Sequence, residues 1–253
     1  MMQIEYGSKG LIGVLTPQAN TTVEPEFWSL MPSGFSLINA RLISSCNSIE
    51  ERLLDYIENL EKSVFQFGNA PIKILAVACT GSSYLIGRKK EEQILNHISD
   101  LLGIKVITSG VSVVKALNNL SAKKIGLCSP YPDALTKLSV DYWESFGFEV
   151  SKVVCISPAN EHFHPIYGIS AQNALKSLEA LNECDVDSIV MLGTGMPTLM
   201  PLIKGNEVAG SKPILSCMLA TVWNSVSSID SNFSNVSPWI KNPVWARRFS
   251  ALQ

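Results

Sequence analysis

The chain has 253 residues, of which 46% are hydrophobic and 17% charged, and its formal net charge is −2. This length and composition suit a globular protein with a well-filled core, built as one large domain or two smaller ones. The nearly balanced charge, with no basic cluster larger than Arg88-Lys89-Lys90, argues against nucleic-acid binding. We therefore expect the partner to be a small molecule.

The N-terminal segment MMQIEYGSKG lacks the apolar stretch of a secretory signal, and no apolar run reaches the roughly 18 residues that span a bilayer. We expect a cytoplasmic chain with no membrane partner. The six cysteines contain no CxxC pair, which argues against a zinc knuckle, a redox pair or a disulfide scaffold. Most of them are expected to be reduced packing residues, so only position can single out a chemical one.

Short apolar runs alternate with longer amphipathic segments along the chain. The runs that we expect to be strands are 11–15, 36–42, 72–78, 105–107, 124–128, 149–155, 188–192 and 213–215. Two of the expected helices are 48–67, which begins with a capping box of Ser48 and Glu51, and 132–146, which begins with proline. This alternation predicts an α/β fold with mostly parallel sheets.

Two blocks of the chain resemble each other. GVLTP from Gly13 matches GLCSP from Gly126, and LAVACTG from Leu75 matches IVMLGTG from Ile189 with nearly the same offset. The shared offset predicts two pseudo-symmetric α/β halves, 1–118 and 119–225, with the tail 226–253 packing back on the first. The alternative is that any two strand–turn–helix junctions of an α/β protein look alike.

If the halves are related by a pseudo-twofold axis, the loops at the carboxyl ends of their strands face each other across a cleft. Ligands of open α/β folds bind at such a place. The four loops expected to line one pocket are 16–22, 79–83, 129–132 and 193–198.

Cys79 is the cysteine whose position points to chemistry. It follows a predicted buried strand and precedes TGSS at 80–83, a typical helix start. Unpaired N–H groups and the positive end of a helix dipole favour a thiolate there, and the same amides can hold a carboxylate or enolate oxygen. We interpret Cys79 as catalytic; the alternative is an inert cysteine at a buried strand end.

The matching turn of the second half keeps Thr194 and Gly195 but has Gly193 in place of the thiol. Gly193 either leaves room for a ligand, donates its backbone N–H, or meets a backbone requirement of the turn. Three further candidates for hydrogen bonds to a carboxylate are Asn20, Tyr131 and Asn160, each of which is also explicable as a turn or packing residue.

No motif for a metal or an organic cofactor stands out. His162 and His164 are separated by one residue, but no further His or Cys cluster accompanies them, so we expect no metal site. The chain has neither a GxGxxG nor a GxxxxGK[ST] motif, and it lacks the GxSxG elbow of serine hydrolases. Chemistry without a cofactor is favoured by elimination.

These features resemble the aspartate/glutamate racemase superfamily, and within it the branch of maleate cis-trans isomerase and arylmalonate decarboxylase. The matching segments are the first loop with Pro17 and Asn20, VACTGSSYLIG, SPYPDAL with the following ESFGFEV, MLGTGMPTL, and Trp223-Asn224. The resemblance covers nearly the whole chain. It implies two Rossmann-like α/β halves around a pocket for a small carboxylate, with no cofactor and no metal.

The resemblance also implies roles for individual residues. Cys79 matches the nucleophilic first-half cysteine, Thr80 and Gly81 the carboxylate-binding turn, Tyr131 a tyrosine that donates to the substrate, and Asn20 and Asn160 binding asparagines. Gly193 falls where the second cysteine usually stands, which disfavours a racemase because that reaction needs two thiols. Arylmalonate decarboxylases use one cysteine in the second half, so here the arrangement is mirrored.

We therefore expect a cofactor-independent cysteine enzyme that acts on a small mono- or dicarboxylate. Cys79 would be nucleophile or proton donor, and the amides of Thr80, Gly81, Thr194 and Gly195 would hold substrate oxygen together with Tyr131. A maleate-type isomerase is the first choice, followed by an arylmalonate-type decarboxylase that protonates from the Cys79 face. An amino-acid racemase and a non-catalytic carboxylate-binding protein are the remaining alternatives. The oligomeric state is open, with a homodimer among the options.

Overall fold

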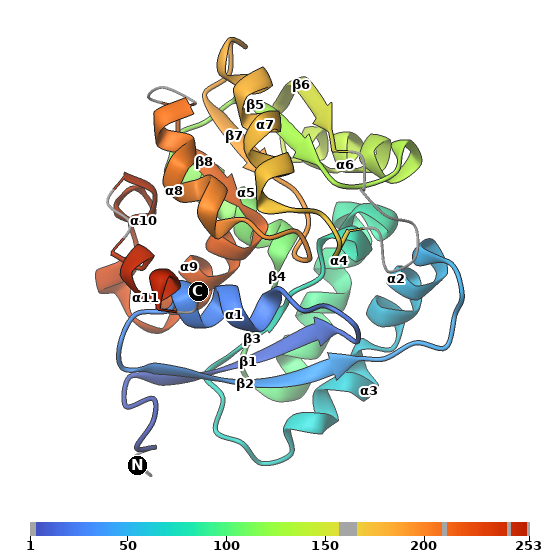
Figure 1. Cartoon of the computed structure of the whole chain (residues 1–253). Coiled ribbons are helices and arrows are strands. Elements are labelled where there is room, and N and C mark those ends of the chain that lie inside the picture. Colours follow the sequence, from blue (N-terminus) through green and yellow to red (C-terminus); the bar gives the residue numbers. More distant parts are fainter. Residues whose placement is uncertain (1–3, 157–165, 209–211, 242–243, 252–253) are drawn as a thin grey trace.

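Two four-stranded parallel sheets organise the computed structural model, which describes residues 4–156, 166–208, 212–241 and 244–251 (Figure 1). The first sheet has the order β2-β1-β3-β4 and contains β1 (Gly10–Pro17), β2 (Phe35–Leu42), β3 (Ile74–Val77) and β4 (Lys105–Thr108). The second has the order β6-β5-β7-β8 and contains β5 (Lys124–Ser129), β6 (Glu149–Cys155), β7 (Ser188–Met191) and β8 (Ile214–Ser216). The expected α/β fold with two similar halves is confirmed.

Helices connect the strands and cover the sheets. They are α1 (Val23–Leu30), α2 (Ile49–Glu58), α3 (Leu60–Val64), α4 (Thr80–Leu102), α5 (Ser109–Asn119), α6 (Asp133–Ser145), α7 (Ala171–Asn182), α8 (Leu199–Val208), α9 (Cys217–Ile229), α10 (Ser237–Lys241) and α11 (Ala246–Ser250), with short 3-10 turns at Phe65–Phe67 and Ser231–Phe233. None of the described helices combines the length and the apolar character needed to cross a membrane.

The helix expected over 48–67 is wrong as a single element, because the chain leaves helical geometry at Asn59. The Asn59 amide donates to the Asp55 carboxylate at 2.6 Å and to the Asp55 carbonyl oxygen at 3.2 Å. A side chain that bonds the preceding turn in this way competes with the backbone ladder. The predicted capping box at the start of α2 is confirmed, with Ser48 and Glu51 bonding reciprocally.

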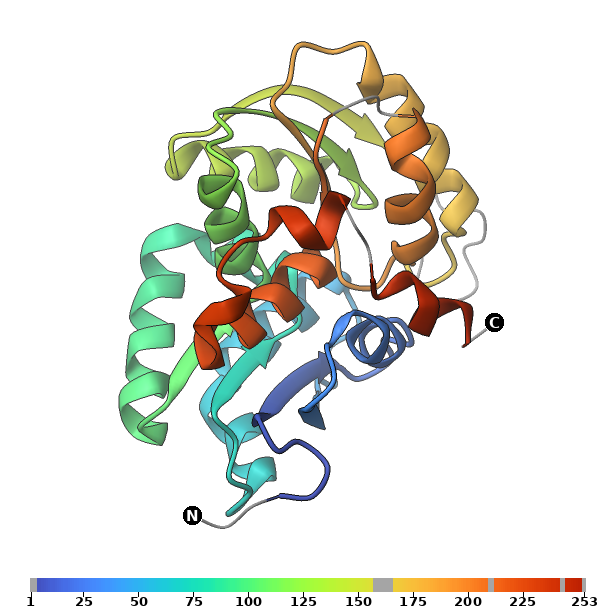
Figure 2. The ribbon, with the colours of Figure 1, turned by 90° about the vertical axis from the view of Figure 1, so that its left-hand side faces the viewer.

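Side chains of β1, β3, β5 and β7 are buried almost throughout, as expected for central strands of parallel sheets covered on both faces. The last helices of the two halves, α5 and α9, pack on each other, and α9 also contacts β3 of the first sheet and β8 of the second. The C-terminal segment therefore lies where the two halves meet (Figure 2). Its Arg248 donates to the carbonyl oxygens of Ser29 and Leu30 at the end of α1.

A buried carboxyl group also joins the halves. Glu26 of α1 accepts hydrogen bonds from the backbone N–H and the hydroxyl group of Thr198, the residue that precedes α8. The side chain is 4% exposed, and burial raises its pKa to about 7 against the opposing effect of the donors at Thr198 and Leu199.

Candidate active site

A small cavity of about 40 Å³ lies at the carboxyl ends of the strands, between the two halves. Its wall consists of Pro17, Asn20, Ile49, Arg52, Leu53, Tyr56, Cys79, Thr80, Gly81, Tyr131, Ile166, Tyr167, Thr194 and Gly195. All four loops singled out from the sequence contribute to it. A volume of this size holds water molecules, so a larger ligand binds only if a lining side chain moves.

Most of the residues proposed from the sequence meet in this wall. They are Asn20, Cys79, Thr80, Gly81, Tyr131, Thr194 and Gly195. Gly193 does not line the cavity, and Asn160 lies outside the described residues.

Direct hydrogen bonds tie the two TG turns together. The Thr194 hydroxyl group donates to the Ala78 carbonyl oxygen at 2.8 Å, next to Cys79. In the reverse direction, the Thr22 hydroxyl group of the first half donates to the Gly195 carbonyl oxygen at 2.8 Å. The loops that the sequence repeat relates therefore face each other across the cavity.

Cys79 stands immediately before α4, with extended backbone geometry (φ −143°, ψ 101°) and a side chain that is 3% exposed. Its Sγ lies 3.2 Å from the Ser82 Oγ. The single hydroxyl proton of Ser82 is donated to the Leu53 carbonyl oxygen at 2.7 Å, so in this pair Cys79 donates and Ser82 accepts. The hydrogen-bond pattern is thus that of a protonated thiol.

The pKa of the Cys79 thiol agrees with this pattern and corrects the expectation of a favoured thiolate. Burial raises the pKa, and the backbone N–H groups of Ser82 and Gly81 oppose the rise without cancelling it. The helix start acts on the sulfur as expected. Desolvation is the larger effect, so the thiol is neutral near neutral pH.

Asn20 presents an amide donor to the cavity. Its Oδ1 accepts from the backbone N–H groups of Thr22 at 2.8 Å and Val23 at 3.2 Å, where α1 begins. The oxygen is therefore occupied, and Nδ2 points toward the Thr194 hydroxyl group at 3.5 Å. This orientation leaves an N–H group for a carboxylate oxygen.

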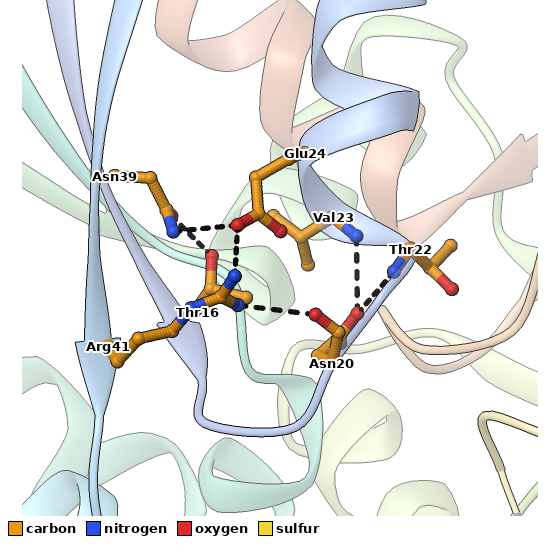
Figure 3. Close-up of polar contacts among 7 residues, drawn as sticks. All are labelled: Thr16, Asn20, Thr22, Val23, Glu24, Asn39 and Arg41. Atoms are coloured by element: carbon orange, nitrogen blue, oxygen red, sulfur yellow. Dashed lines mark hydrogen bonds and ion pairs between the residues drawn. The ribbon is translucent and has the colours of Figure 1, made fainter. Parts of the chain in front are cut away.

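A polar network fixes the Asn20 loop from behind (Figure 3). Arg41 of β2 donates to the Asn20 carbonyl oxygen at 3.2 Å and forms an ion pair with Glu24. Glu24 also accepts from the Asn39 amide at 2.9 Å, and the Thr16 hydroxyl group donates to Asn39 at 2.6 Å. The position of Asn20 is thus set by two strands and by the first turn of α1.

Tyr131 and Thr80 supply hydroxyl groups to the same wall. Burial raises the pKa of Tyr131 well above its usual value, which keeps the phenol protonated as a donor. Thr80 Oγ1 is buried and makes no well-formed hydrogen bond within the described part of the chain, although Tyr131 and the thiol of Cys217 lie near it. A buried hydroxyl group without a partner is available to a bound oxygen atom.

Gly193 meets a backbone requirement, one of the readings left open by the sequence. Its φ is +84°, in the left-handed region that favours glycine. An added Cβ would lie 3.1 Å from Pro130 Cγ and 3.3 Å from the Tyr131 hydroxyl oxygen. The Gly193 N–H group faces the buried Cys217 thiol, whose pKa burial raises to about 11. The two turns match in sequence but differ in backbone at this position.

Sequence reasoning missed three polar residues of the wall, Arg52 and Tyr56 of α2 and Tyr167. Arg52 and Tyr56 are four residues apart and share one face of the helix. That spacing is the only signal the sequence offers, since the placement of α2 beside Cys79 depends on tertiary packing. Tyr167 packs on Gly195, where an added Cβ would lie 2.4 Å from its ring.

Comparison with known proteins agrees with this geometry. The arylmalonate decarboxylase family model matches residues 12–237. The maleate isomerase of Alcaligenes faecalis is 23% identical over 233 residues, covering 86% of this chain and 90% of the relative. The maleate isomerase of Geobacillus stearothermophilus is 25% identical, covering 87% and 91%.

Solved structures share the fold. The maleate isomerase Iso from Pseudomonas putida S16 has a TM-score of 0.79 at 21% identity, covering 87% of this chain and 93% of that one. A serine-substituted Nocardia farcinica maleate cis-trans isomerase with a covalently bound succinylcysteine intermediate has a TM-score of 0.77 at 23% identity, with 87% and 93% coverage. Arylmalonate decarboxylase has a TM-score of 0.68 at 16% identity, with 87% and 92% coverage.

Proposed function

The chain belongs to the arylmalonate decarboxylase family, and we propose that it is a cofactor-independent cysteine enzyme that isomerises a small cis-dicarboxylate of the maleate type. The observation that carries this proposal is the Cys79 thiol in the wall of a cavity that Asn20, Thr80 and Tyr131 supply with uncharged donors. The maleate isomerase relatives and the succinylcysteine intermediate in a neighbour of the same fold support it.

In the proposed reaction the donors of Asn20, Tyr131 and Thr80 hold one substrate carboxylate beside the sulfur. The Cys79 sulfur bonds to one alkene carbon while the π electron pair moves to the other carbon and its carboxylate. The proton released by the thiol ends on that second carbon. Rotation about the new single bond and elimination then give the trans alkene and restore the S–H bond. Donors already placed in a buried site stabilise the charge that develops on the carboxylate.

Decarboxylation of a substituted malonate is the second candidate, and the neutral state of the Cys79 thiol specifically favours it. Loss of one carboxylate as CO2 would leave an enediolate, and the thiol would protonate its carbon from the Cys79 face. A two-thiol racemase is disfavoured, because the left-handed backbone at Gly193 does not suit a side chain. Asn160 stays a predicted binding residue of the site.

Proton NMR in deuterated water with maleate, substituted malonates and amino acids separates these reactions. Cis–trans conversion, loss of a carboxylate with deuterium uptake, and α-deuterium exchange alone give three different spectra. We expect conversion of maleate, its loss in Cys79→Ser, and its retention in Cys155→Ser, which changes an exposed cysteine outside the cavity. Full activity in Cys79→Ser, or no reaction with any of these substrates, would contradict the proposal.

A further inference from the structure

Arg52 is the one charged side chain among the described residues that line the cavity. It is half-buried, and its Nε donates to the Ser48 carbonyl oxygen at 3.3 Å. No carboxylate within the described chain forms an ion pair with it, whereas Arg41 nearby is paired with Glu24. Among the described residues, the terminal nitrogens of the Arg52 guanidinium therefore have no carboxylate partner.

Two tyrosines connect this guanidinium with the thiol. Tyr56 lies one turn after Arg52 on the same face of α2, and Tyr167 lies in the same wall. Burial is the largest cause that raises the pKa of both phenols, Cys79 adds to the rise, and Arg52 opposes it. Arg52, Tyr56, Tyr167 and Cys79 all line one small cavity, which places Arg52 within the reach of a ligand bound at Cys79.

The other side chains that can donate to a ligand in this cavity are uncharged. Asn20, Thr80 and Tyr131 can satisfy one carboxylate through hydrogen bonds, whereas the hydroxyl proton of Thr194 is already donated to the Ala78 carbonyl oxygen. A second negative charge taken out of water into the same small space is costly unless a cation pairs with it. A guanidinium suits this task, since its planar N–H groups match the two oxygens of a carboxylate.

We propose that Arg52, assisted by the neighbouring Tyr56, forms a second anion subsite that binds the substrate carboxylate farther from the reacting carbon. Arg52 would then be the residue that selects a dicarboxylate over a monocarboxylate with an apolar end. The identity of the substrate as a dicarboxylate rests on the proposed function. The subsite itself is tested by the affinity for ligands that do not react.

Succinate and butyrate are suitable probes, because both have four carbons and no double bond and they differ by one carboxylate. Their dissociation constants are to be measured by NMR titration with the wild type, Arg52→Gln, Arg52→Lys and Arg247→Gln. Arg247 is an exposed arginine of α11 outside the cavity wall, so its substitution removes the same charge elsewhere.

We expect the wild type and Arg247→Gln to bind succinate more tightly than butyrate. Arg52→Gln should weaken succinate binding about 10-fold, the usual size of a lost charge-assisted hydrogen bond, and leave butyrate binding unchanged. Arg52→Lys should keep part of the preference, because it keeps the charge and loses the planar fork. Unchanged butyrate binding in Arg52→Gln also shows that the loss of succinate binding in this variant is not caused by unfolding.

An equal loss of affinity for succinate and butyrate in Arg52→Gln would overturn the subsite, because it would indicate a structural role of Arg52. The absence of a succinate preference in the wild type would overturn it as well. If the wild type converts maleate and Arg52→Gln binds succinate with unchanged affinity, the subsite is rejected and the proposed function stands. An Arg52-dependent preference without conversion of maleate would reject the function and support the subsite.

Discussion

At the scale of single residues, the environment of Cys79 shows how two opposite effects act on one thiol. The N–H groups of α4 favour the charged form, and burial favours the neutral form. The neutral form prevails; it suits the direct protonation of a carbon, whereas in an addition the S–H proton must leave as the sulfur bonds to carbon. The left-handed backbone of Gly193 provides no comparable place for a thiol in the matching turn.

Alkylation rates test the neutral state of Cys79. We expect iodoacetamide to modify Cys79 more slowly than the exposed Cys155 near neutral pH, because only the thiolate reacts and a raised pKa lowers its fraction. The Cys79 rate should continue to climb as the pH increases beyond the usual thiol range. Mass spectrometry of the labelled peptides measures both rates, and faster labelling of Cys79 at neutral pH would contradict the expectation.

At the scale of elements, the loops and helix starts that follow the strands carry most side chains of the site, and α2 adds Arg52 and Tyr56. The apolar runs of the central strands β1, β3, β5 and β7 were recognisable because these strands are buried on both faces and read as continuous apolar sequence. Cys79, Thr80 and Thr194 were found because they stand at ends of such strands. Arg52 and Tyr56 were missed because their helix approaches the site from the side. The break at Asn59 depends on one side-chain contact that propensity does not encode.

The contact between Glu26 of α1 and the start of α8 gives a pH-dependent stability. The Glu26 carboxyl group is protonated below about pH 7 in the folded chain but only below its ordinary pKa of 4.5 in the unfolded chain. The folded state therefore binds more protons between these values. The contribution of Glu26 to the free energy of unfolding is fully present below pH 4.5. It is lost as the pH rises through 7, and the free energy of unfolding then falls by up to about 3 kcal/mol.

Urea unfolding of the wild type and Glu26→Gln at about pH 5 and about pH 8 measures this contribution. The wild type should lose more stability than the variant between the two values, because glutamine does not titrate. An identical pH dependence in both proteins would show that Glu26 has an ordinary pKa in the folded chain.

At the scale of the whole molecule, we propose the division into 1–118 and 119–225 as two structural halves that depend on each other. The α9 helix packs on β3 and β4 as well as on β8, and α11 contacts both α1 and α8. The sequence repeat indicated two halves, but it could not show that the C-terminal helices lie at their junction, because a packing partner is not visible in a local pattern.

Separate fragments test this dependence. We expect 1–118 alone to remain unfolded, because the surface of β3 and β4 that α9 covers would face water. Co-expression with 119–253 should restore a folded complex. Circular dichroism and the dispersion of amide proton signals report both states. A folded, independent 1–118 fragment would contradict the proposed dependence.

The left-handed turn at Gly193 has a consequence for mutation of this position. A cysteine codon at this position would place its side chain on a backbone that L-residues rarely adopt, against Pro130 and Tyr131. Recovery of a second thiol would thus require the turn to be rebuilt before the new residue could be useful. A single substitution at this position therefore does not give a two-thiol site, because the backbone of the turn has to change as well.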